Sequence, residues 1–323
     1  MKEHARGCSK DPRAWASLRA PLGGASPDVA PCPGSVTRRD FVAVAAAVTA
    51  TAVLATLPAS AAQTAPAPLI DTNVSLGRWP FRRSPLEETT ALVDKLSSHG
   101  VTQAWAGSFD AIFHKDLSDV NRRLAQECRL RGRGLLIPFG AVNPGLPGWE
   151  EDLRRCHTEH RMRGIRLFPN YHGYGLDTPA FANLLKLAAA SNLVVQIACG
   201  LEDQRTQSPR LQFPPVDVSP LSQWLGRSTA PRVQLLNAFR ALRGKPVLDL
   251  AAHGARFEIA TLEGVEGVSK LLAQIPADRL CFGSHAPFFY FESAELKLRE
   301  SVLTATQWEA VRAGNARRLL SSA

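Results

Sequence analysis

The fold is decided by the first of several short apolar runs in this chain, which reads PLIDTNVSLG at residues 68–77. Aliphatic and β-branched residues dominate the run, and a proline and a glycine bound it, which is typical of a β-strand. A longer amphipathic stretch follows, and the next apolar run begins at residue 101. This alternation of short apolar runs with longer amphipathic segments indicates βαβ units around a parallel sheet.

Eight such runs recur, and their number decides between the two common parallel architectures. They occupy residues 68–77, 101–109, 135–143, 164–170, 193–200, 232–238, 256–263 and 280–285. Eight strand–helix units in roughly 250 residues is the size of a closed (β/α)8 barrel, the TIM barrel. An open doubly wound sheet usually has about five or six strands and a glycine-rich phosphate loop after the first, and this sequence has no such loop. We therefore predict an α/β protein with one (β/α)8 barrel domain.

The segments between the apolar runs carry helix signals. Residues 117–130, 149–160, 179–190, 265–275 and 294–320 show the 3.6-residue spacing of apolar positions that marks an amphipathic helix. Ser84, Pro85 and Glu87 fit the N-cap, N1 and N3 positions of a helix start. Gly100 supplies a stop for the same helix. The long connection at residues 201–220 is expected to contact or cover a substrate.

The first 61 residues are predicted to be an export signal that precedes the barrel. Arg38 and Arg39 come before Phe41, an uncharged run rich in Ala and Val extends to Leu57, and a small-residue cleavage pattern ends at Ala61. This order is typical of a twin-arginine signal peptide. We therefore expect a periplasmic or secreted protein, with a linker at residues 62–68 and the barrel at residues 69–323.

Two alternatives concern this leader. The apolar run from Phe41 to Leu57 barely spans a bilayer, so a retained membrane anchor is the less favoured interpretation. Residues 1–36 exceed what such a leader needs, and a start at an alternative codon near Val36 would leave them untranslated. After cleavage we expect no stable membrane span.

Composition narrows the class of function. The chain has 323 residues, of which 45% are hydrophobic and 21% charged, an ordinary globular composition. The net charge is +9, but basic residues occur singly or in pairs rather than in a stripe with interleaved aromatics, so nucleic acid is not an expected partner. The four cysteines beyond the leader match no zinc or C-x-x-C spacing, and we expect them to be buried thiols.

Four motifs together point to a family. The opening strand, GIRL at 164–167, FGSHAP at 282–287 and NARRLL at 315–320 resemble the amidohydrolase-related family, which includes decarboxylases of the aminocarboxymuconate type. The same superfamily contains lactonases of the 2-pyrone-4,6-dicarboxylate type, which open their substrate without a metal. The resemblance extends from about Leu69 to Leu320 and implies a barrel enzyme that acts on a small molecule.

The resemblance also implies a metal site, and this sequence departs from it. The family carries Asp-x-His-x-His on the first strand, a His at the ends of the fifth and sixth strands, and an Asp at the end of the eighth. The corresponding positions here hold, in chain order, Asn73, Ser75, Ala198, Asn237 and His285. Asn, Ser and Ala do not replace the imidazoles that hold zinc. We therefore predict no metal cofactor, with a divalent metal as the alternative.

Polar residues at the carboxyl ends of the strands are the site candidates, because barrel active sites lie there. The predicted catalytic residues are His285, Asn73, His172, Glu202 and Glu263. His285 is expected to act as a general base with an ordinary pKa of about 6.5, and the Asn amides as oxyanion donors. The predicted substrate-binding residues are Ser75, Asn237, Asn170, Asp110, His114, Arg82 and Arg205. Arg166 is expected to be scaffold, paired inside the barrel with a carboxylate such as Asp71.

These residues leave three functions open. The favoured one is a metal-free hydrolase of a small carboxylated, lactone or amide-type compound, in which a His and a carboxylate move protons. The second is a degenerate barrel that binds a small ligand or a partner protein without turnover, and the third is a decarboxylase. Polar side chains at four of the five substituted positions, with only Ala198 apolar, favour an enzyme over a degenerate barrel.

Overall fold

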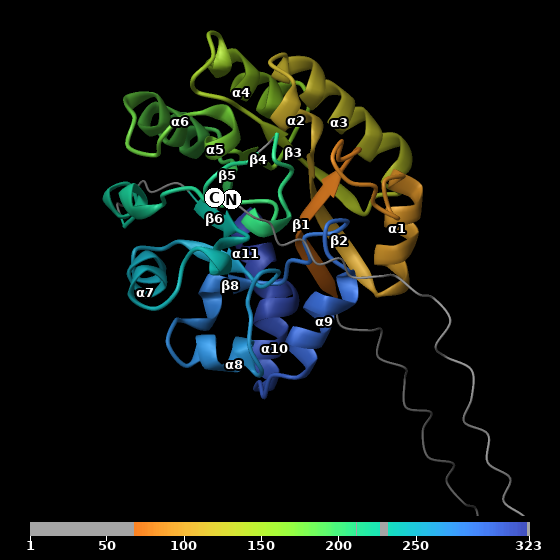
Figure 1. Cartoon of the computed structure of the whole chain (residues 1–323), viewed down its shortest axis with the longest axis vertical. Helices are drawn as coiled ribbons and strands as arrows, with labels where there is room; N and C mark the ends of the chain where they lie inside the picture. Colours follow the sequence, from red (N-terminus) through yellow and green to blue (C-terminus); the bar gives the residue numbers. More distant parts are fainter. Residues whose placement is uncertain (1–67, 211, 227–231, 322–323) are drawn as a thin grey trace, which may run out of the picture. The chain divides into compact units, whose positions relative to one another are not determined.

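A computed structural model describes residues 68–210, 212–226 and 232–321, and every structural statement below concerns these residues. Eight parallel strands are hydrogen-bonded in chain order from β1 to β8. They are β1 (Leu69–Leu76), β2 (Val101–Ser108), β3 (Leu136–Ala141), β4 (Gly164–Leu167), β5 (Val194–Ala198), β6 (Arg232–Leu236), β7 (Arg256–Glu258) and β8 (Leu280–Cys281). The strands form a nearly closed barrel, and Figure 1 shows the helices arranged around it.

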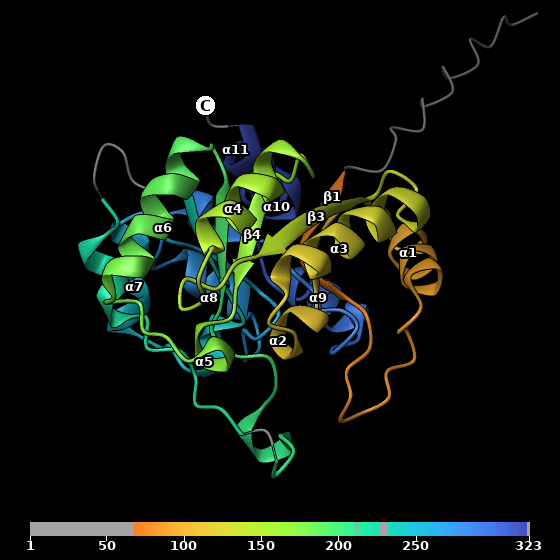
Figure 2. The same ribbon diagram turned by 90° about the horizontal axis from the view of Figure 1, so that it is seen from above.

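Eleven α-helices occur in the described residues, most of them on the outside of the barrel. They are α1 (Thr89–Ser98), α2 (Asp110–Phe113), α3 (Leu117–Arg131), α4 (Trp149–Thr158), α5 (Pro169–His172), α6 (Pro179–Ala190), α7 (Lys245–Ala252), α8 (Gly267–Leu272), α9 (Phe291–Arg299), α10 (Ala305–Glu309) and α11 (Asn315–Ser321). Figure 2 shows α3, α4 and α6 outside the strands. The predicted (β/α)8 architecture is confirmed.

The barrel closes between β1 and the segment that follows β8. The Thr72 N–H donates to the Phe282 carbonyl over 3.0 Å, and the His285 N–H donates to the Asn73 carbonyl over 2.9 Å. These hydrogen bonds continue the ladder beyond Cys281, where β8 itself ends. Closure therefore brings the segment that contains His285 directly against the middle of β1.

All eight predicted strands form, but β7 and β8 end earlier than predicted. β7 ends at Glu258 instead of residue 263, because the Glu258 carboxylate accepts the Ala260 N–H and turns the chain. β8 ends before His285, whose φ of +59° lies in the left-handed region and does not continue a strand. Both endings change which side chains close the strands, and so they change the candidate site.

The helix predictions succeed where an amphipathic pattern is uninterrupted. α6 has the predicted bounds of Pro179–Ala190. The predicted start at Ser84 is wrong, since Ser84 and Glu87 form a separate turn through a 2.9 Å hydrogen bond and α1 begins at Thr89. The predicted helix at 294–320 is divided into α9, α10 and α11, because Thr304 forms a capping box that starts a new helix.

The predicted leader at residues 1–61 lies outside the described residues, as do residues 62–67 of the predicted linker. Among the described helices, none combines the length and the apolar character that crossing a membrane requires. The cysteines beyond the leader are free and buried, as predicted. Burial raises the pKa of each thiol to about 12, so these side chains are unreactive in the folded state.

A polar network fills the middle of the barrel. Arg166 on β4 is 1% exposed and donates from Nε to Gln196 Oε1 over 2.9 Å, and from its two terminal nitrogens to the carbonyls of Val74 and Trp105. Among the described residues Asp71 makes no hydrogen bond to Arg166, whose donors are directed to carbonyl, amide and hydroxyl oxygens, but the charge of Asp71 acts on Arg166 as expected. Gly107 leaves the space for this guanidinium, since a Cβ there would lie 2.8 Å from Arg166 Nη1.

Candidate functional site

Four polar side chains meet at the carboxyl end of the barrel, and we call them the central cluster: Asn73, Asn237, Glu258 and His285. The Asn73 side-chain amide donates to Asn237 Oδ1 over 3.0 Å and to Glu258 Oε1 over 3.2 Å. The Asn237 amide lies 3.5 Å from His285 Nδ1. Exposure of these residues is at most 4%, so the cluster is enclosed by protein. Strand closure thus brings together the predicted residues Asn73, Asn237 and His285.

His285 is held as a neutral imidazole. Its Nε2 lies 2.9 Å from the Leu201 carbonyl and its Nδ1 faces the Asn237 amide, a pattern that fits a proton on Nε2. Burial lowers the pKa of His285 to about 3, although the Leu201 carbonyl opposes the shift. The expected pKa of about 6.5 therefore does not apply, and His285 is a weak base in this enclosed position.

Glu258 was missed in the sequence, which pointed to Glu263 as the carboxylate at the end of the seventh strand. Its Oε1 accepts the backbone N–H of Asn237 over 2.6 Å. Burial, and to a smaller extent the negative charge of Asp71, raise the pKa of Glu258 to about 7 against the opposing hydrogen bonds from the Asn237 and Ala260 N–H groups. Gly283 provides its space, because a Cβ at that position would lie 2.7 Å from Glu258 Oε2. The barrel therefore holds a carboxyl group that titrates near neutral pH.

Asp71 lies next to this cluster at the same depth in the barrel. Its carboxylate accepts the side-chain O–H and the backbone N–H of Ser284, and also the backbone N–H of Asn73. Burial raises the pKa of Asp71 to about 6, while these hydrogen bonds and the charge of Arg166 oppose the shift. Asp71 thus holds Ser284, the residue before His285, through these hydrogen bonds, and it also places a titratable charge beside the cluster.

An apolar cap covers the cluster at the mouth of the barrel. We define it as Trp79, Phe109, Phe168, Leu201 and Phe288, of which all but the partly buried Phe288 are buried. The Trp79 ring packs against Phe109 and Phe288 with centroid distances of 5.5 and 5.0 Å. Ala198, where the family resemblance places a His, is buried in the same group. Phe288 also packs against the His285 ring, with a centroid distance of 5.2 Å, so the apolar cap borders the cluster on this side.

The connection after β5 crosses this mouth and is held there by a hydrogen bond and an ion pair. The Leu201 carbonyl faces His285 Nε2, and the adjacent Glu202 carboxylate lies 3.8 Å from a terminal nitrogen of Arg82. Arg82 in turn lies over the Phe288 ring, 4.8 Å from its centroid. Burial raises the pKa of Glu202 against the opposing charge of Arg82. Glu202 and Arg82 therefore join the connections after β5, β1 and β8.

A pocket of about 340 Å³, which we call the rim pocket, opens beside the cluster. Asn237 belongs both to the cluster and to the wall of this pocket. Its charged lining residues are Glu202, Asp203, Arg205, Arg240, Arg243 and Glu263. Arg240 pairs with Asp203 over 3.0 Å. The predicted residues Glu202, Arg205 and Glu263 thus come together at the rim, and Arg240 is a lining residue that sequence reasoning missed.

The remaining predicted residues lie away from His285. His172 Nε2 contacts the Ala111 carbonyl over 2.9 Å, and its Nδ1 is buried without a hydrogen-bond partner. Asp110 pairs with Arg123 over 2.5 Å, and His114 is exposed. The Asn170 side chain donates to the Pro214 carbonyl over 3.0 Å. Ser75 is the exception, because its N–H donates to the Ala286 carbonyl, next to His285, while its hydroxyl lies 3.3 Å from Arg166 Nη1. The side chains of these five residues do not join the central cluster.

The donors of the central cluster do not suit a transition metal. The described residues contain no group of three or more His, Cys, Asp or Glu side chains that could hold a metal ion. Glu258 and Asp71 direct their oxygens to N–H and O–H donors, and a metal would have to displace these hydrogen bonds. His285 is the one imidazole in the cluster, whereas zinc, iron and manganese sites in proteins combine several imidazole or carboxylate ligands.

Several solved structures with the same fold are decarboxylases. The 5-carboxyvanillate decarboxylase of Sphingomonas paucimobilis is 15% identical, with a TM-score of 0.61 over 79% of this chain and 99% of that chain. The 2,6-dihydroxybenzoate decarboxylase of Rhizobium is 14% identical, with a TM-score of 0.58 over 79% of this chain and 98% of that chain. A dihydroxybenzoic acid decarboxylase of a Polaromonas species, solved with manganese and 2-nitroresorcinol, is 14% identical, with a TM-score of 0.61 over 78% of this chain and 96% of that chain. At these identities the likeness establishes the fold.

Curated protein sequences give no significant match to this chain. The sequence profile of the family described as amidohydrolase, in contrast, matches residues 79–321. This range includes every strand from β2 to β8 and three of the four residues of the central cluster. The chain therefore belongs to the amidohydrolase family.

Proposed function

We propose that this chain decarboxylates a small carboxylic acid without a metal, with Glu258 as the proton donor. The observation that carries the proposal is the fully buried Glu258 carboxyl, hydrogen-bonded to Asn73 and Asn237 and with a pKa of about 7. A general acid is most effective when its pKa lies near the working pH. A carboxyl group of ordinary pKa would hold almost no proton there.

The proposed reaction replaces a carboxylate on carbon by hydrogen. Glu258 gives its proton to the carbon that carries the carboxylate, the bond between the two carbons breaks, and carbon dioxide leaves. Solvent then returns a proton to Glu258. The side-chain amides of Asn73 and Asn237, which donate to Glu258 Oε1 and to the Gly200 carbonyl in this structure, would donate instead to a substrate oxygen that gains negative charge.

The environment of Glu258 favours decarboxylation over the hydrolysis predicted from the sequence. Hydrolysis needs a water molecule beside the acid, whereas decarboxylation needs only the substrate and a proton. Glu258 is 0% exposed, and the apolar cap lies above the cluster. The fold shared with the 5-carboxyvanillate and 2,6-dihydroxybenzoate decarboxylases supports the same choice. Hydrolase activity remains a prediction from the sequence.

Substrate binding in this proposal begins at the rim pocket. Arg205, Arg240 and Arg243 line it and would attract a carboxylate, and Asn237 connects it to the cluster. The substrate would reach Glu258 when the hydrogen bond between Leu201 and His285 opens. We therefore propose that the substrate enters the barrel where the connection that follows β5 moves away from His285.

The proposal is tested with a panel of hydroxybenzoic and other small carboxylic acids labelled with ¹³C at the carboxyl carbon. Release of labelled bicarbonate is followed by NMR, with EDTA present in one series and Mn²⁺ added in another. We expect turnover in EDTA, and a loss of about two to four orders of magnitude in Glu258→Gln. Glu150→Gln is the matched control, since Glu150 is exposed in the first turn of α4 and lines neither the central cluster nor the rim pocket. Turnover that needs Mn²⁺, or that survives in Glu258→Gln, would refute the proposal.

A barrel that binds a small ligand without turnover is the second candidate, and one observation favours it. The polar atoms of the central cluster are hydrogen-bonded to one another and to the backbone, as in a structural core. The same panel distinguishes the two candidates, because a ligand that binds only the folded state raises the melting temperature. Stabilisation without release of bicarbonate by any stabilising acid would select this second candidate.

A further inference from the structure

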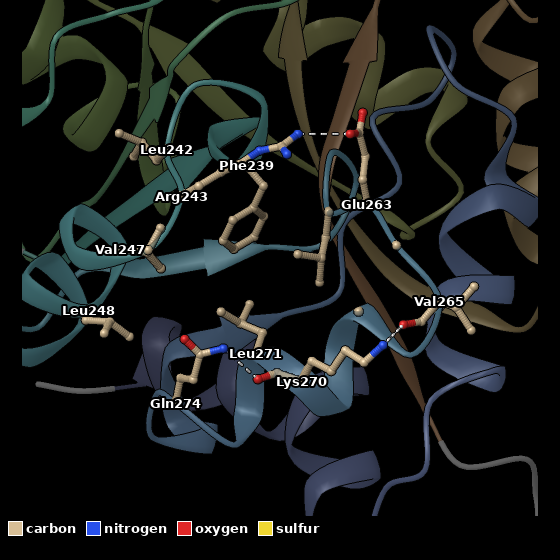
Figure 3. A pocket seen from close by; sticks show the side chains of 14 residues that line it. Phe239, Leu242, Arg243, Val247, Leu248, Glu263, Val265, Lys270, Leu271 and Gln274 are labelled. Atoms are coloured by element: carbon tan, nitrogen blue, oxygen red, sulfur yellow. Dashed lines mark hydrogen bonds and ion pairs between the residues drawn. The ribbon is translucent and has the colours of Figure 1, made fainter.

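A second concave surface lies outside the barrel, between α7 and α8. It has a volume of about 280 Å³, and we call it the α7–α8 groove. Figure 3 shows Leu242, Val247, Leu248 and Leu271 on its walls, with Arg243 and Lys270 around it. Arg243 and Glu263 also line the rim pocket, so the two sites are neighbours. The central cluster contributes no residue to the groove.

The groove exposes apolar side chains that the fold leaves partly uncovered. Leu242, Leu248, Leu262 and Leu271 are partly buried and pack against the core on one side. Val265, in the loop before α8, is 72% exposed at the edge. Apolar side chains gathered around a concave surface indicate a binding site more strongly than the same side chains scattered singly. The occupant should therefore have an apolar body.

The charged groups at the edge give the groove a positive balance. Arg243 and Lys270 are cationic, and Glu263 is the one anionic lining residue. Arg243 and Glu263 form an exposed ion pair over 3.1 Å. Lys270 Nζ donates one hydrogen bond to the Val265 carbonyl over 2.9 Å. An ammonium group has three donors, so Lys270 keeps donors for an anionic group at the end of an apolar ligand.

We propose that the α7–α8 groove binds an amphipathic carboxylate, with its hydrocarbon body between the leucines and its carboxylate beside Lys270 and Arg243. Volume sets the size of the ligand. A cavity of about 150 Å³ lined by Leu, Ile and Phe holds benzene. The groove has nearly twice that volume, which fits a chain of about eight to ten carbons or a two-ring acid. The groove is distinct from the central cluster, because Glu258 does not line it, but it shares Arg243 and Glu263 with the rim pocket.

The test measures binding of straight-chain carboxylates from butanoate to decanoate by isothermal titration calorimetry. Each methylene that enters the groove should tighten binding by about two- to fourfold, until the groove is filled. The primary alcohol of equal length should bind about fivefold more weakly, because it lacks the charge that faces Lys270. Lys270→Gln should remove most of the difference between the acid and the alcohol.

Two variants close the groove in different ways. Leu271→Glu places a negative charge in its wall, and Gln274→Trp fills it from an exposed position just after α8 without changing a core residue. Both should weaken octanoate binding at least about tenfold. The control is Leu296→Glu on α9, whose side chain is 62% exposed outside the groove and whose change should leave binding unaltered.

Three results would overturn the inference. They are no binding of octanoate or decanoate below millimolar concentration, an affinity that does not depend on chain length, and wild-type affinity in both Leu271→Glu and Gln274→Trp. In the last case the acid binds elsewhere, and the rim pocket is the next site to test. Glu258→Gln should bind octanoate like the wild type. Failure of this inference is therefore distinguishable from failure of the proposed decarboxylation.

Discussion

Replacement of Glu258 by Gln tests the central feature of the site through stability, without knowledge of the substrate. Burial raises the pKa of Glu258 from 4.5 to about 7, so the folded state holds this proton more tightly than the unfolded chain does. The stabilisation is complete below pH 4.5 and is lost as the pH rises to about 7. At 1.36 kcal/mol for each pKa unit, the loss is about 3 kcal/mol.

Gln keeps the size of Glu but does not ionise, so it removes this dependence on pH. It also replaces one carboxyl oxygen by an NH2 group, which leaves the N–H of Asn237 or of Ala260 without its acceptor. An unpaired buried donor costs about 1 to 3 kcal/mol. Glu258→Gln should therefore be less stable than the wild type at pH 5, and within about 2 kcal/mol of it at pH 8.

Urea unfolding at pH 5, 6, 7 and 8 provides the measurement, and the difference between wild type and variant isolates Glu258 from other titrating groups. Asp71 titrates in the same range with a pKa of about 6 and is present in both proteins, so the difference retains only its charge coupling to Glu258. Parallel pH profiles for wild type and Glu258→Gln would mean that Glu258 has an ordinary pKa. The proposed acid would then be ionised at neutral pH, and the reasoning would fail.

Two further predictions concern His285 and the leader. Burial lowers the pKa of His285 to about 3, so the wild type should lose stability as the pH falls from 6.5 to 3. His285→Asn should remove that part of the loss, because Asn does not titrate and tolerates the left-handed backbone at this position. Urea unfolding at pH 4 and 7 measures the loss, and equal losses in both proteins would contradict the prediction. Replacement of Arg38 and Arg39 together by Lys should hold the protein in the cytoplasm. Cell fractionation measures the outcome, and unchanged export of the double variant would remove the twin-arginine interpretation.

The architecture could be predicted from the sequence because it depends on local patterns repeated many times. Each apolar run predicted one strand, and an error of a few residues at one end did not change the count of eight. α6 was located at both ends, since Thr178 and Pro179 begin it and an unbroken apolar spacing follows. Local signals failed at Ser84, where the capping pattern formed an isolated turn.

The candidate site could be predicted only in part, because side chains from distant strands compose it. Alignment to the family pattern located Asn73, Asn237 and His285, and closure of the barrel brings them together. Glu258 escaped notice because it lies inside an apolar run, where the expected strand end was residue 263. Its signal was an acidic residue within an apolar run, because a buried carboxyl is rarely found without a specific partner.

The near-neutral pKa of Glu258 follows first from its burial, and the balance of charge inside the barrel adds to it. Burial lowers the pKa of Arg166 to about 10. The guanidinium therefore stays protonated at neutral pH and provides one buried positive charge. Asp71, with a pKa of about 6, ionises first and balances it. A second ionised carboxyl would leave the interior negative, and the charge of Asp71 accordingly raises the pKa of Glu258. The acid therefore arises from three residues on β1, β4 and β7, and no single stretch of the sequence specifies it.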